Sequence, residues 1–376
     1  MKIIQEGLTF DDVLLIPTDS NIMPNQTILK TQLTQHITLH IPIISAAMDT
    51  VTESAMAIEI ALHGGMGILH RHMNIQEQVN QVTLVKKIII SNTQNPLACI
   101  DTNGQLRVGA AVGTDNSSQE RVKMLVDAQV DAIVIDTAHG HSQSVLQMVA
   151  WIKNKYPTIA VIAGNIVTAQ AARALVDHGV DAVKVGIGPG AACTTRIVTG
   201  VGFPQLSAIL NVAQELQKTA VTVIADGGIR FSGDISKALA AGAHAIMVGQ
   251  LLAATQEAPG KLIEENGTFY KVYRGMHSLG ALAHKYSTDD KHFKPTNHKL
   301  VPEGAEGKVL CRGTLGDTLY QLLGGVRACM GYLGCQTIEQ LQQKAQFVRV
   351  TNASIKESHV HDIVITNQAP NYFVTK

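Results

Sequence analysis

Eight short apolar runs, separated by segments of helical character, constrain the fold of this chain more than any other feature. Each run is rich in β-branched residues and ends at or near Gly, Asp or Ser. In order they are IPIISA (41–46), MGILH (66–70), LRVGAAV (106–112), AIVIDTA (132–138), AVIAGN (160–165), AVKVGIG (182–188), VTVIADGG (221–228) and AIMVGQ (245–250). Near-continuous apolarity is typical of parallel strands that are covered on both faces.

The segments between these runs favour helices, at 52–63, 74–87, 117–129, 143–155, 168–179, 204–217 and 233–241. Eight strands that alternate with helices predict an α/β protein with a closed (β/α)8 TIM barrel. An open, doubly wound sheet is the alternative that the same alternation allows. We expect one catalytic domain over residues 1–376, because α/β barrels commonly exceed 250 residues as single units.

The eighth strand is not followed promptly by a helix. Residues 253–314 are polar, rich in glycine and weakly periodic, and the next helical pattern is TLYQLLGGVRACMGYLG (318–334). An irregular segment of this length in a compact domain is usually functional or disordered. After a barrel strand it would overhang the carboxyl end of the barrel, where barrel active sites lie. We therefore expect a flap over the active site at 253–314.

Composition excludes several classes of partner. Lys plus Arg equals Asp plus Glu at 30 each, so the net charge indicates neither nucleic acid nor an anionic membrane. The five cysteines are scattered without metal-ligand spacing, which fits a reducing compartment. The N-terminal MKIIQEGLTFDDVLLIP has no signal-peptide core, and no run reaches the roughly 18 apolar residues of a membrane span. We expect a soluble, cytoplasmic protein.

The sequence GPGAACTTR (188–196) places Cys193 in a turn of small residues after the sixth strand. Its glycines allow a sharp turn and a close approach of the backbone to a ligand. A thiol at the barrel mouth can act as a covalent nucleophile if its pKa is lowered, and Arg196 or a bound ion could lower it. An inert cysteine in a tight turn is the alternative reading.

Other strand ends carry polar side chains to the same mouth. The residues predicted to converge there are Met48, Arg71, Asp136, Asn165, Cys193, Asp226 and Gly249. The last two strand ends of many barrels bind phosphate through backbone amides, which leaves Asp226 free to accept hydrogen bonds from a sugar diol. A capping carboxylate is the alternative role for Asp226. His139 and His141 lack a third metal ligand and are interpreted as loop residues.

These motifs resemble the inosine-5′-monophosphate dehydrogenase (IMPDH) and GMP reductase family, in particular the bacterial IMP dehydrogenases. The resemblance runs almost end to end, through LTFDDVLLIP, IPIISAAMDTVTE, LRVGAAVG, VIDTAHGHS, AGNIVT, VKVGIGPGAACTTRIVTGVGFPQ, VIADGGIRFSGDI, YRGMHSLGA, KLVPEGAEGKV and ESHVHDIVITNQAPNY. It implies a TIM barrel that assembles into homotetramers. Family members usually carry a pair of regulatory CBS repeats between the second helix and the third strand, where this chain has only a short linker at 88–105. The resemblance therefore implies that these repeats are absent.

The chemistry implied by the resemblance is oxidation of IMP to XMP with NAD, through a covalent thioimidate on Cys193. Thr195 and Glu303 match a pair that activates water for hydrolysis. The implied substrate-binding residues are Ala46, Met48, Asp226, Gly228, Gly249, Gln250, Tyr273, Gly275, Met276, His277 and Glu303. The implied NAD-binding residues are Asp136, Thr137, Asn165 and Gly186.

The resemblance also implies a monovalent cation, normally potassium. Its ligands would be backbone carbonyls of the cysteine loop together with the C-terminal tail (346–376) of a neighbouring subunit. The matching positions are Gly188, Gly190, Cys193, Glu357, Ser358 and His359. Carbonyl oxygens suit such a hard cation. An unstructured C-terminus is the alternative for the tail.

Four departures from the family pattern fall in the site. Ala191 and Gln250 each replace a usual serine, and His277 replaces a glycine of the flap. The Arg-Tyr pair with which the family activates water is missing; alignment on the flanking residues puts Lys291 and His292 in its place, and an ungapped alignment puts Asp289 and Asp290 there. A histidine has a pKa suited to a general base. We therefore expect slow hydrolysis of the covalent intermediate.

Two alternatives to IMP dehydrogenase remain open. GMP reductase is a related barrel that lacks the regulatory repeats, but it should have Lys at the position of Arg71, Glu in the segment after YRGM, and no tail like ESHVHD. A non-catalytic paralogue that binds a purine nucleotide could also accumulate the four departures.

Overall fold

The computed structural model describes residues 3–283 and 301–372, and within them eight parallel strands close into a barrel. In neighbour order the strands are β10 (Thr222–Asp226), β11 (Ala245–Val248), β4 (Ile43–Ser45), β5 (Met66–Leu69), β6 (Val108–Val112), β7 (Ala132–Asp136), β8 (Ala160–Ile166) and β9 (Ala182–Val185). Each coincides with one of the apolar runs. The predicted TIM barrel is confirmed, and the closed ring excludes the open doubly wound sheet.

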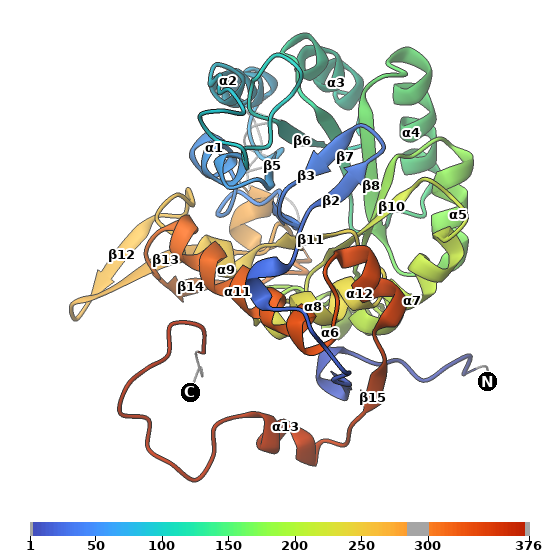
Figure 1. Cartoon of the computed structure of the whole chain (residues 1–376). Coiled ribbons are helices and arrows are strands. Elements are labelled where there is room, and N and C mark those ends of the chain that lie inside the picture. Colours follow the sequence, from blue (N-terminus) through green and yellow to red (C-terminus); the bar gives the residue numbers. More distant parts are fainter. Residues whose placement is uncertain (1–2, 284–300, 373–376) are drawn as a thin grey trace.

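Helices surround the barrel, as Figure 1 shows. The seven predicted between the strands are present with ends within two residues of expectation: α1 (Ser54–Leu62), α2 (Ile75–Lys86), α3 (Ser118–Asp127), α4 (Gln143–Lys155), α5 (Ala169–Asp177), α7 (Gln205–Leu216) and α8 (Ser232–Ala240). The eighth barrel helix is α11 (Leu315–Tyr332). A capping box fixes the start of α2. The Asn74 side-chain oxygen accepts from the Glu77 backbone N–H at 2.9 Å, and the Glu77 carboxylate accepts from the Asn74 backbone N–H at 3.0 Å.

Burial of both faces explains why the barrel strands appear in the sequence as apolar runs. Every residue of β4, β5, β6, β9 and β11 is buried, since the inner faces fill the barrel and the outer faces pack under the helices. Lys184 is the one charged residue in these five strands.

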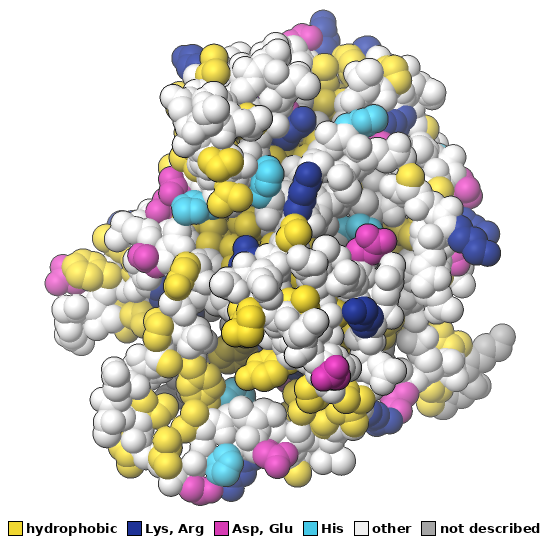
Figure 2. Space-filling model, viewed as in Figure 1, with side chains coloured by type: hydrophobic (Ala, Val, Ile, Leu, Met, Phe, Trp, Pro, Cys, Tyr) yellow, Lys and Arg dark blue, Asp and Glu magenta, His cyan; other side chains and the backbone are white. Residues whose placement is uncertain are grey.

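A hairpin of β2 (Thr31–Thr34) and β3 (Ile37–Leu39) closes the amino-terminal end of the barrel. The Thr31 hydroxyl donates to the carbonyl of His244, just before β11, at 2.7 Å, and the Thr222 hydroxyl at the start of β10 donates to the Leu33 carbonyl. The hairpin lies in front of the barrel in Figure 1. Figure 2 shows charged side chains of both signs scattered over this face. The opposite end of the barrel, where the strands have their carboxyl termini, carries the candidate site.

The segment after β11 contains regular structure that the sequence pattern did not indicate. It begins with α9 (Gln250–Ala253), and an antiparallel sheet follows, formed by β12 (Leu262–Glu265), β13 (Thr268–Arg274) and β14 (Glu306–Leu310). β12 and β14 are largely exposed on both faces, so neither shows the apolar alternation of a half-buried strand. The remainder of the predicted flap, 284–300, lies outside the described residues.

An N-terminal segment and a C-terminal segment pair with each other at the side of the barrel. β1 (Val13–Leu15) pairs antiparallel with β15 (Phe347–Arg349), which follows α12 (Ile338–Lys344). Beyond β15, the tail forms α13 (Ala353–Ser358) and continues as an irregular loop (Figure 1), in which Tyr372 stacks on Phe231 next to α8. Short 3-10 turns occupy Phe10–Asp12 and Pro24–Gln26, and α6 (Thr195–Thr199) follows the cysteine loop. No helix in the described part of the chain could cross a bilayer.

Candidate active site

A cleft at the carboxyl ends of the barrel strands gathers most of the predicted site residues. Those that line it are Ala46, Met48, Asp136, Thr137, Asn165, Gly186, Gly188, Gly190, Cys193, Thr195, Asp226, Tyr273, Gly275, Met276, His277 and Glu303. Gly249 lies at its edge, because a Cβ on this glycine would be 3.2 Å from the Met48 sulfur. Arg71, which follows β5, also lines the cleft.

The other predicted residues lie elsewhere. Gly228, Gln250, Glu357, Ser358 and His359 do not line the cleft, and Lys291 and His292 lie outside the described residues. Gln250 and His359 instead border a second cavity beside Phe231. The His359 ring accepts or donates a hydrogen bond with the Tyr372 hydroxyl at 2.9 Å, and both rings pack against Phe231. In a single copy of the chain, therefore, His359 is held by the tail and α8 rather than by the cysteine loop.

The cysteine loop is joined to residues 303–305 by backbone pairing. Thr194 N–H donates to the Glu303 carbonyl at 3.0 Å, and Ala305 N–H donates to the Ala192 carbonyl at 2.8 Å. Cys193 consequently forms an isolated antiparallel bridge with Gly304. This pairing brings two distant parts of the chain to one edge of the cleft.

A chain of side-chain hydrogen bonds leads away from the sulfur. The Cys193 thiol donates to the Thr195 hydroxyl at 3.2 Å, and that hydroxyl donates to the Glu303 carboxylate at 2.9 Å. All three residues line the cleft. A proton can therefore pass from sulfur to carboxylate through one hydroxyl, which is what formation of a thiolate nucleophile requires.

Two glycines permit the close packing of this edge. Gly188 has φ +89°, and a Cβ there would lie 2.5 Å from Cγ of Arg196. A Cβ on Gly275 would lie 2.9 Å from the Ala192 carbonyl oxygen. The first position needs glycine for its backbone conformation and its space, and the second needs it for space alone.

A buried lysine in the cleft was missed by the sequence analysis. Lys184 on β9 is 3% exposed, and its ammonium lies 2.8 Å from Asp136 Oδ1 and 2.6 Å from Asp226 Oδ2. Burial alone would raise the pKa of Asp136, but the charge of Lys184 and its hydrogen bond outweigh burial and lower it. The signal available in the sequence was a single lysine in the otherwise apolar run AVKVGIG.

The pKa of the Tyr273 hydroxyl is raised, first by burial and then by the negative charges of Asp226 and Cys193. Tyr273 therefore stays protonated at neutral pH and can donate a hydrogen bond into the cleft. It lies on β13, so the added sheet supplies a donor to the barrel site.

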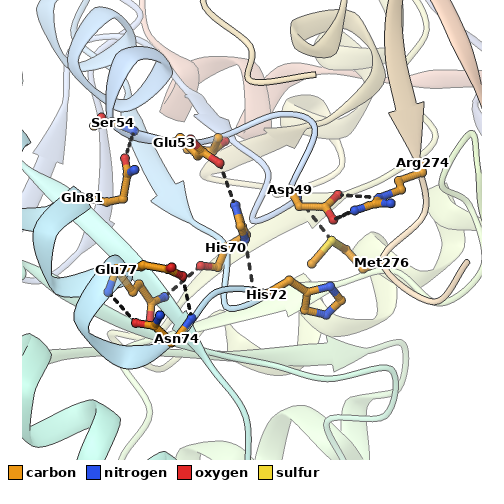
Figure 3. Close-up of polar contacts among 12 residues, drawn as sticks. Asp49, Glu53, Ser54, His70, His72, Asn74, Glu77, Gln81, Arg274 and Met276 are labelled. Atoms are coloured by element: carbon orange, nitrogen blue, oxygen red, sulfur yellow. Dashed lines mark hydrogen bonds and ion pairs between the residues drawn. The ribbon is translucent and has the colours of Figure 1, made fainter. Parts of the chain in front are cut away.

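An ion pair attaches the added sheet to the loop after β4. Figure 3 shows Arg274, at the end of β13, directed at the Asp49 carboxylate, with the Met276 side chain beside the same loop. The Arg274 Nε–Asp49 Oδ2 distance is 3.0 Å, and the Asp49 side chain is only 7% exposed. The Asp49 N–H also points at the Met276 sulfur at 3.4 Å. The sheet is thus fixed where Tyr273 of β13 and Met276, just after this strand, border the cleft.

A second polar network in Figure 3 orders the segment after β5. The His70 Nδ1 accepts from the backbone N–H of His72 at 3.2 Å, so its Nε2 carries the proton and faces Glu53 at 3.4 Å. This contact shapes the turn that presents Arg71 to the cleft.

No group of three or more His, Cys, Asp and Glu side chains suited to a metal ion occurs among the residues that the structure covers. His139 and His141, whose ring centroids are 6.4 Å apart, do not line the cleft.

Comparison with known proteins agrees with the geometry. A family model described as "IMP dehydrogenase / GMP reductase domain" matches residues 7–361. The chain is 42% identical to the inosine-5′-monophosphate dehydrogenase of Aquifex aeolicus over 485 aligned positions, which cover 99% of each chain. It is 40% identical to that of Chlorobaculum tepidum over 488 positions and 41% identical to that of Escherichia coli K12 over 485, again with 99% of each chain covered.

Proposed function

Because this chain belongs to the IMP dehydrogenase/GMP reductase family, we propose that it oxidises IMP to XMP with NAD as the oxidant. The observation that carries the proposal is the position of Cys193 at the cleft, with Thr195 and Glu303 in line to remove the thiol proton. Such an arrangement supports nucleophilic catalysis.

The reaction would proceed in two steps. The thiol of Cys193 would lose its proton, and the sulfur would form a bond to C2 of the purine while the C2=N3 double bond opens and N3 takes up a proton, so that C2 becomes tetrahedral. C2 would then transfer a hydride to NAD and N3 would release its proton, which restores the double bond and leaves a thioimidate. Water would next add across this double bond; the carbon–sulfur bond would then break, the new hydroxyl would lose its proton and the sulfur would take one up, which yields XMP and restores the thiol. The nucleophile is needed because C2 becomes a good hydride donor only once it is tetrahedral.

Ligand contacts follow from the same proposal. Asp226 would accept hydrogen bonds from the ribose hydroxyls of IMP, and Gly228, Gly249 and Tyr273 would hold its phosphate. Ala46, Met48, Gly275, Met276 and His277 would border the base. Asp136, Thr137, Asn165 and Gly186 would contact NAD. The clustering of most of these residues around one cleft supports the assignment.

A potassium ion would lie at the cysteine loop, held by the carbonyls of Gly188, Gly190 and Cys193. The Gly190 carbonyl already accepts from the Cys193 N–H at 3.0 Å, but its second lone pair is free for an ion. Within one chain His359 packs against Phe231 and does not line the cleft. Glu357, Ser358 and His359 would therefore complete the coordination shell of the ion from a neighbouring subunit. The ion would supply charge that favours the loop conformation.

The proposal includes a cytoplasmic homotetramer without the regulatory CBS repeats. The alignments extend over 485 and 488 positions, beyond the 376 residues of this chain, so the relatives have residues with no counterpart here. The linker at 88–105 folds against the barrel: Cys99 is buried, and Lys86 pairs with Asp101 at 2.9 Å. A closed connection of this kind is consistent with a chain that functions without an inserted module.

Hydrolysis of the thioimidate would be the slow step. His277 stands where the family has glycine, and Lys291 and His292 replace the Arg-Tyr pair. Lysine lacks the planar fork of arginine, so it cannot reproduce the same contacts. Thr195 and Glu303 would then activate water without the help of a second pair.

The function is tested by mixing the purified protein with IMP, NAD and potassium, and separately with GMP and NADPH. NADH formation in the first mixture and no NADPH consumption in the second support the proposal. The reverse result would identify a GMP reductase, and inactivity in both would favour a nucleotide-binding paralogue.

A further inference from the structure

The ammonium group of Lys184, on β9, connects the strands on both sides of its own at the cleft: β7 and β8 on one side and β10 on the other. It donates to Asp136 on β7, to Asp226 on β10 and to the side-chain oxygen of Asn165 on β8. An ammonium has three protons, and each has one acceptor here. The Lys184 side chain is 3% exposed, so water does not compete for these contacts.

Asn165 reinforces the arrangement. Its side-chain amide donates to Asp226 Oδ2 at 2.9 Å and to the Gly186 carbonyl at 2.7 Å. Asp226 therefore receives hydrogen bonds from both the lysine and the amide. The two aspartates cannot move independently, because each is bonded to the same nitrogen.

We propose that Lys184 is a positioning residue that sets the spacing between Asp136 and Asp226, and hence between the two ligands of the reaction. The inference rests on the proposed function, in which Asp226 binds the IMP ribose and Asp136 contacts NAD. Hydride transfer needs the donor and acceptor carbons in near contact, and a misplacement of about 1 Å can cost roughly a hundredfold in rate.

Lys184 also balances charge. Two carboxylates that share one buried nitrogen repel each other once the lysine is removed, so one of them would take up a proton. The other titratable groups that act on this pair are Arg71 and His277, which face Asp136, and Tyr273, whose hydroxyl faces Asp226.

The test compares Lys184→Met with Lys184→Arg in the full-length protein. Methionine keeps the length of the stem and removes the charge, whereas arginine keeps the charge and cannot reach three acceptors from one atom. For the Met variant we expect KM to rise about tenfold or more for both IMP and NAD, because both carboxylates are disturbed. For the Arg variant we expect KM within about twofold of wild type and a kcat about a hundredfold lower.

The pH profile of kcat/KM provides a readout that a purely structural role would not change. In the Met variant the unscreened carboxylate binds a proton more readily, so the acidic limb should move to higher pH. In the Arg variant the limb should stay at the wild-type position. Titration calorimetry with IMP alone and NAD alone measures binding independently of turnover.

Lys86→Met is the matched control. Lys86 on α2 is also buried and also lies between two carboxylates, Asp101 at 2.9 Å and Asp131 at 3.0 Å, but it does not line the cleft. Its variant should lose stability and keep wild-type KM values. A Lys86 variant whose kinetics change like those of the Lys184 variant would overturn the proposal.

Three further outcomes are decisive. A Met variant with unchanged KM values and pH profile, in an active protein, overturns the inference and leaves the proposed function standing. If the Met variant does not fold, the Arg variant decides, and an unchanged kcat overturns the proposal. A wild-type protein that binds neither IMP nor NAD overturns both.

Discussion

The hydroxyl of Thr195 donates a hydrogen bond of 2.9 Å to the carboxylate of Glu303, although 108 residues separate them in the chain. The contact exists because the cysteine loop pairs with residues 303–305 through backbone hydrogen bonds. It extends the Cys193 thiol contact to a carboxylate that can accept a proton. The proposed nucleophile and the carboxylate that would accept its proton thus come from different parts of the chain, the loop after β9 and the segment before β14.

Glu303→Gln should slow both chemical steps, because Glu303 is in line to accept the thiol proton and, in the proposed function, also activates water. The amide has nearly the shape of the carboxylate but does not accept a proton at neutral pH. We expect NADH formation in the first turnover and the steady-state rate each to fall by about a hundredfold or more, the usual worth of a general base. Stopped-flow absorbance measures both phases.

Glu264→Gln, on the exposed strand β12, is the control for this substitution and should behave like wild type. A full burst of NADH in the Glu303 variant, followed by a slow steady state, would show that Glu303 acts only in hydrolysis and does not accept the thiol proton.

Arg274→Met should destabilise the protein by about 2–4 kcal/mol, because it leaves the buried Asp49 carboxylate without its partner. Equilibrium unfolding in urea measures the change. Combining Asp49→Asn with Arg274→Met should recover part of the lost free energy of unfolding, because the double variant has no unpaired buried charge.

The exposed pair Arg173–Glu215 provides the comparison for Arg274. The Arg173 side chain is 68% exposed, and Arg173→Met should lower the free energy of unfolding by less than about 1 kcal/mol. Equal losses at the two arginines would mean that the Asp49 contact does not secure the added sheet.

Gly188→Ala should impair the cysteine loop. The residue has φ +89°, and the new methyl group would meet the Arg196 side chain at 2.5 Å. Backbone strain of this kind costs about 1–3 kcal/mol, and the clash adds to it. We expect a fall in kcat/KM together with a lower Tm.

Gly200→Ala isolates the backbone component of that effect. Gly200 has φ +74° and nothing within 4 Å of its added Cβ, so only the conformational strain applies. If the two alanine variants lose equal stability, the packing of Arg196 against Gly188 is unimportant.

Stability should fall as the pH falls from about 7 to about 5, in part because of His244. Burial lowers the pKa of this histidine, and its Nδ1 accepts the Val223 N–H at 3.2 Å, which requires the unprotonated ring nitrogen. The unfolded chain has a histidine pKa near 6.5, so below that pH it binds protons that the folded state does not. Protonation therefore favours unfolding.

His244→Asn tests this assignment, because the Asn side-chain oxygen can occupy the place of Nδ1 without titrating. The difference in Tm between wild type and variant, measured by thermal denaturation across this range, should shrink or reverse toward acidic pH. A difference that is independent of pH would contradict it.

The barrel could be predicted from the sequence because its signal is local. Each strand is buried on both faces and therefore appears as a continuous apolar run, and the caps mark the helix starts, as at Asn74. The sheet of β12, β13 and β14 has no such signal. Its outer strands are exposed, and β13 pairs with β14 across residues that are far apart in the chain.

Residues of the candidate cleft could be predicted only where the residue type and its place at a strand end were both informative, as for Cys193 and Asp226. Lys184 was missed because a residue within an apolar run is assigned to the strand, and its contacts to Asp136 and Asp226 depend on barrel closure. The Asp49–Arg274 ion pair joins residues 225 apart, and neither residue has a local pattern that indicates the other.

The most direct test of covalent catalysis at Cys193 compares the wild-type protein with the Cys193→Ser variant. Each is mixed with IMP, NAD and potassium, and the formation of NADH is measured. A hydroxyl at this position is a far weaker nucleophile than a thiolate at neutral pH. We predict that the wild-type protein produces NADH and that the serine variant, with a wild-type Tm, does not. NADH formation at an equal rate by the serine variant would contradict covalent catalysis at Cys193.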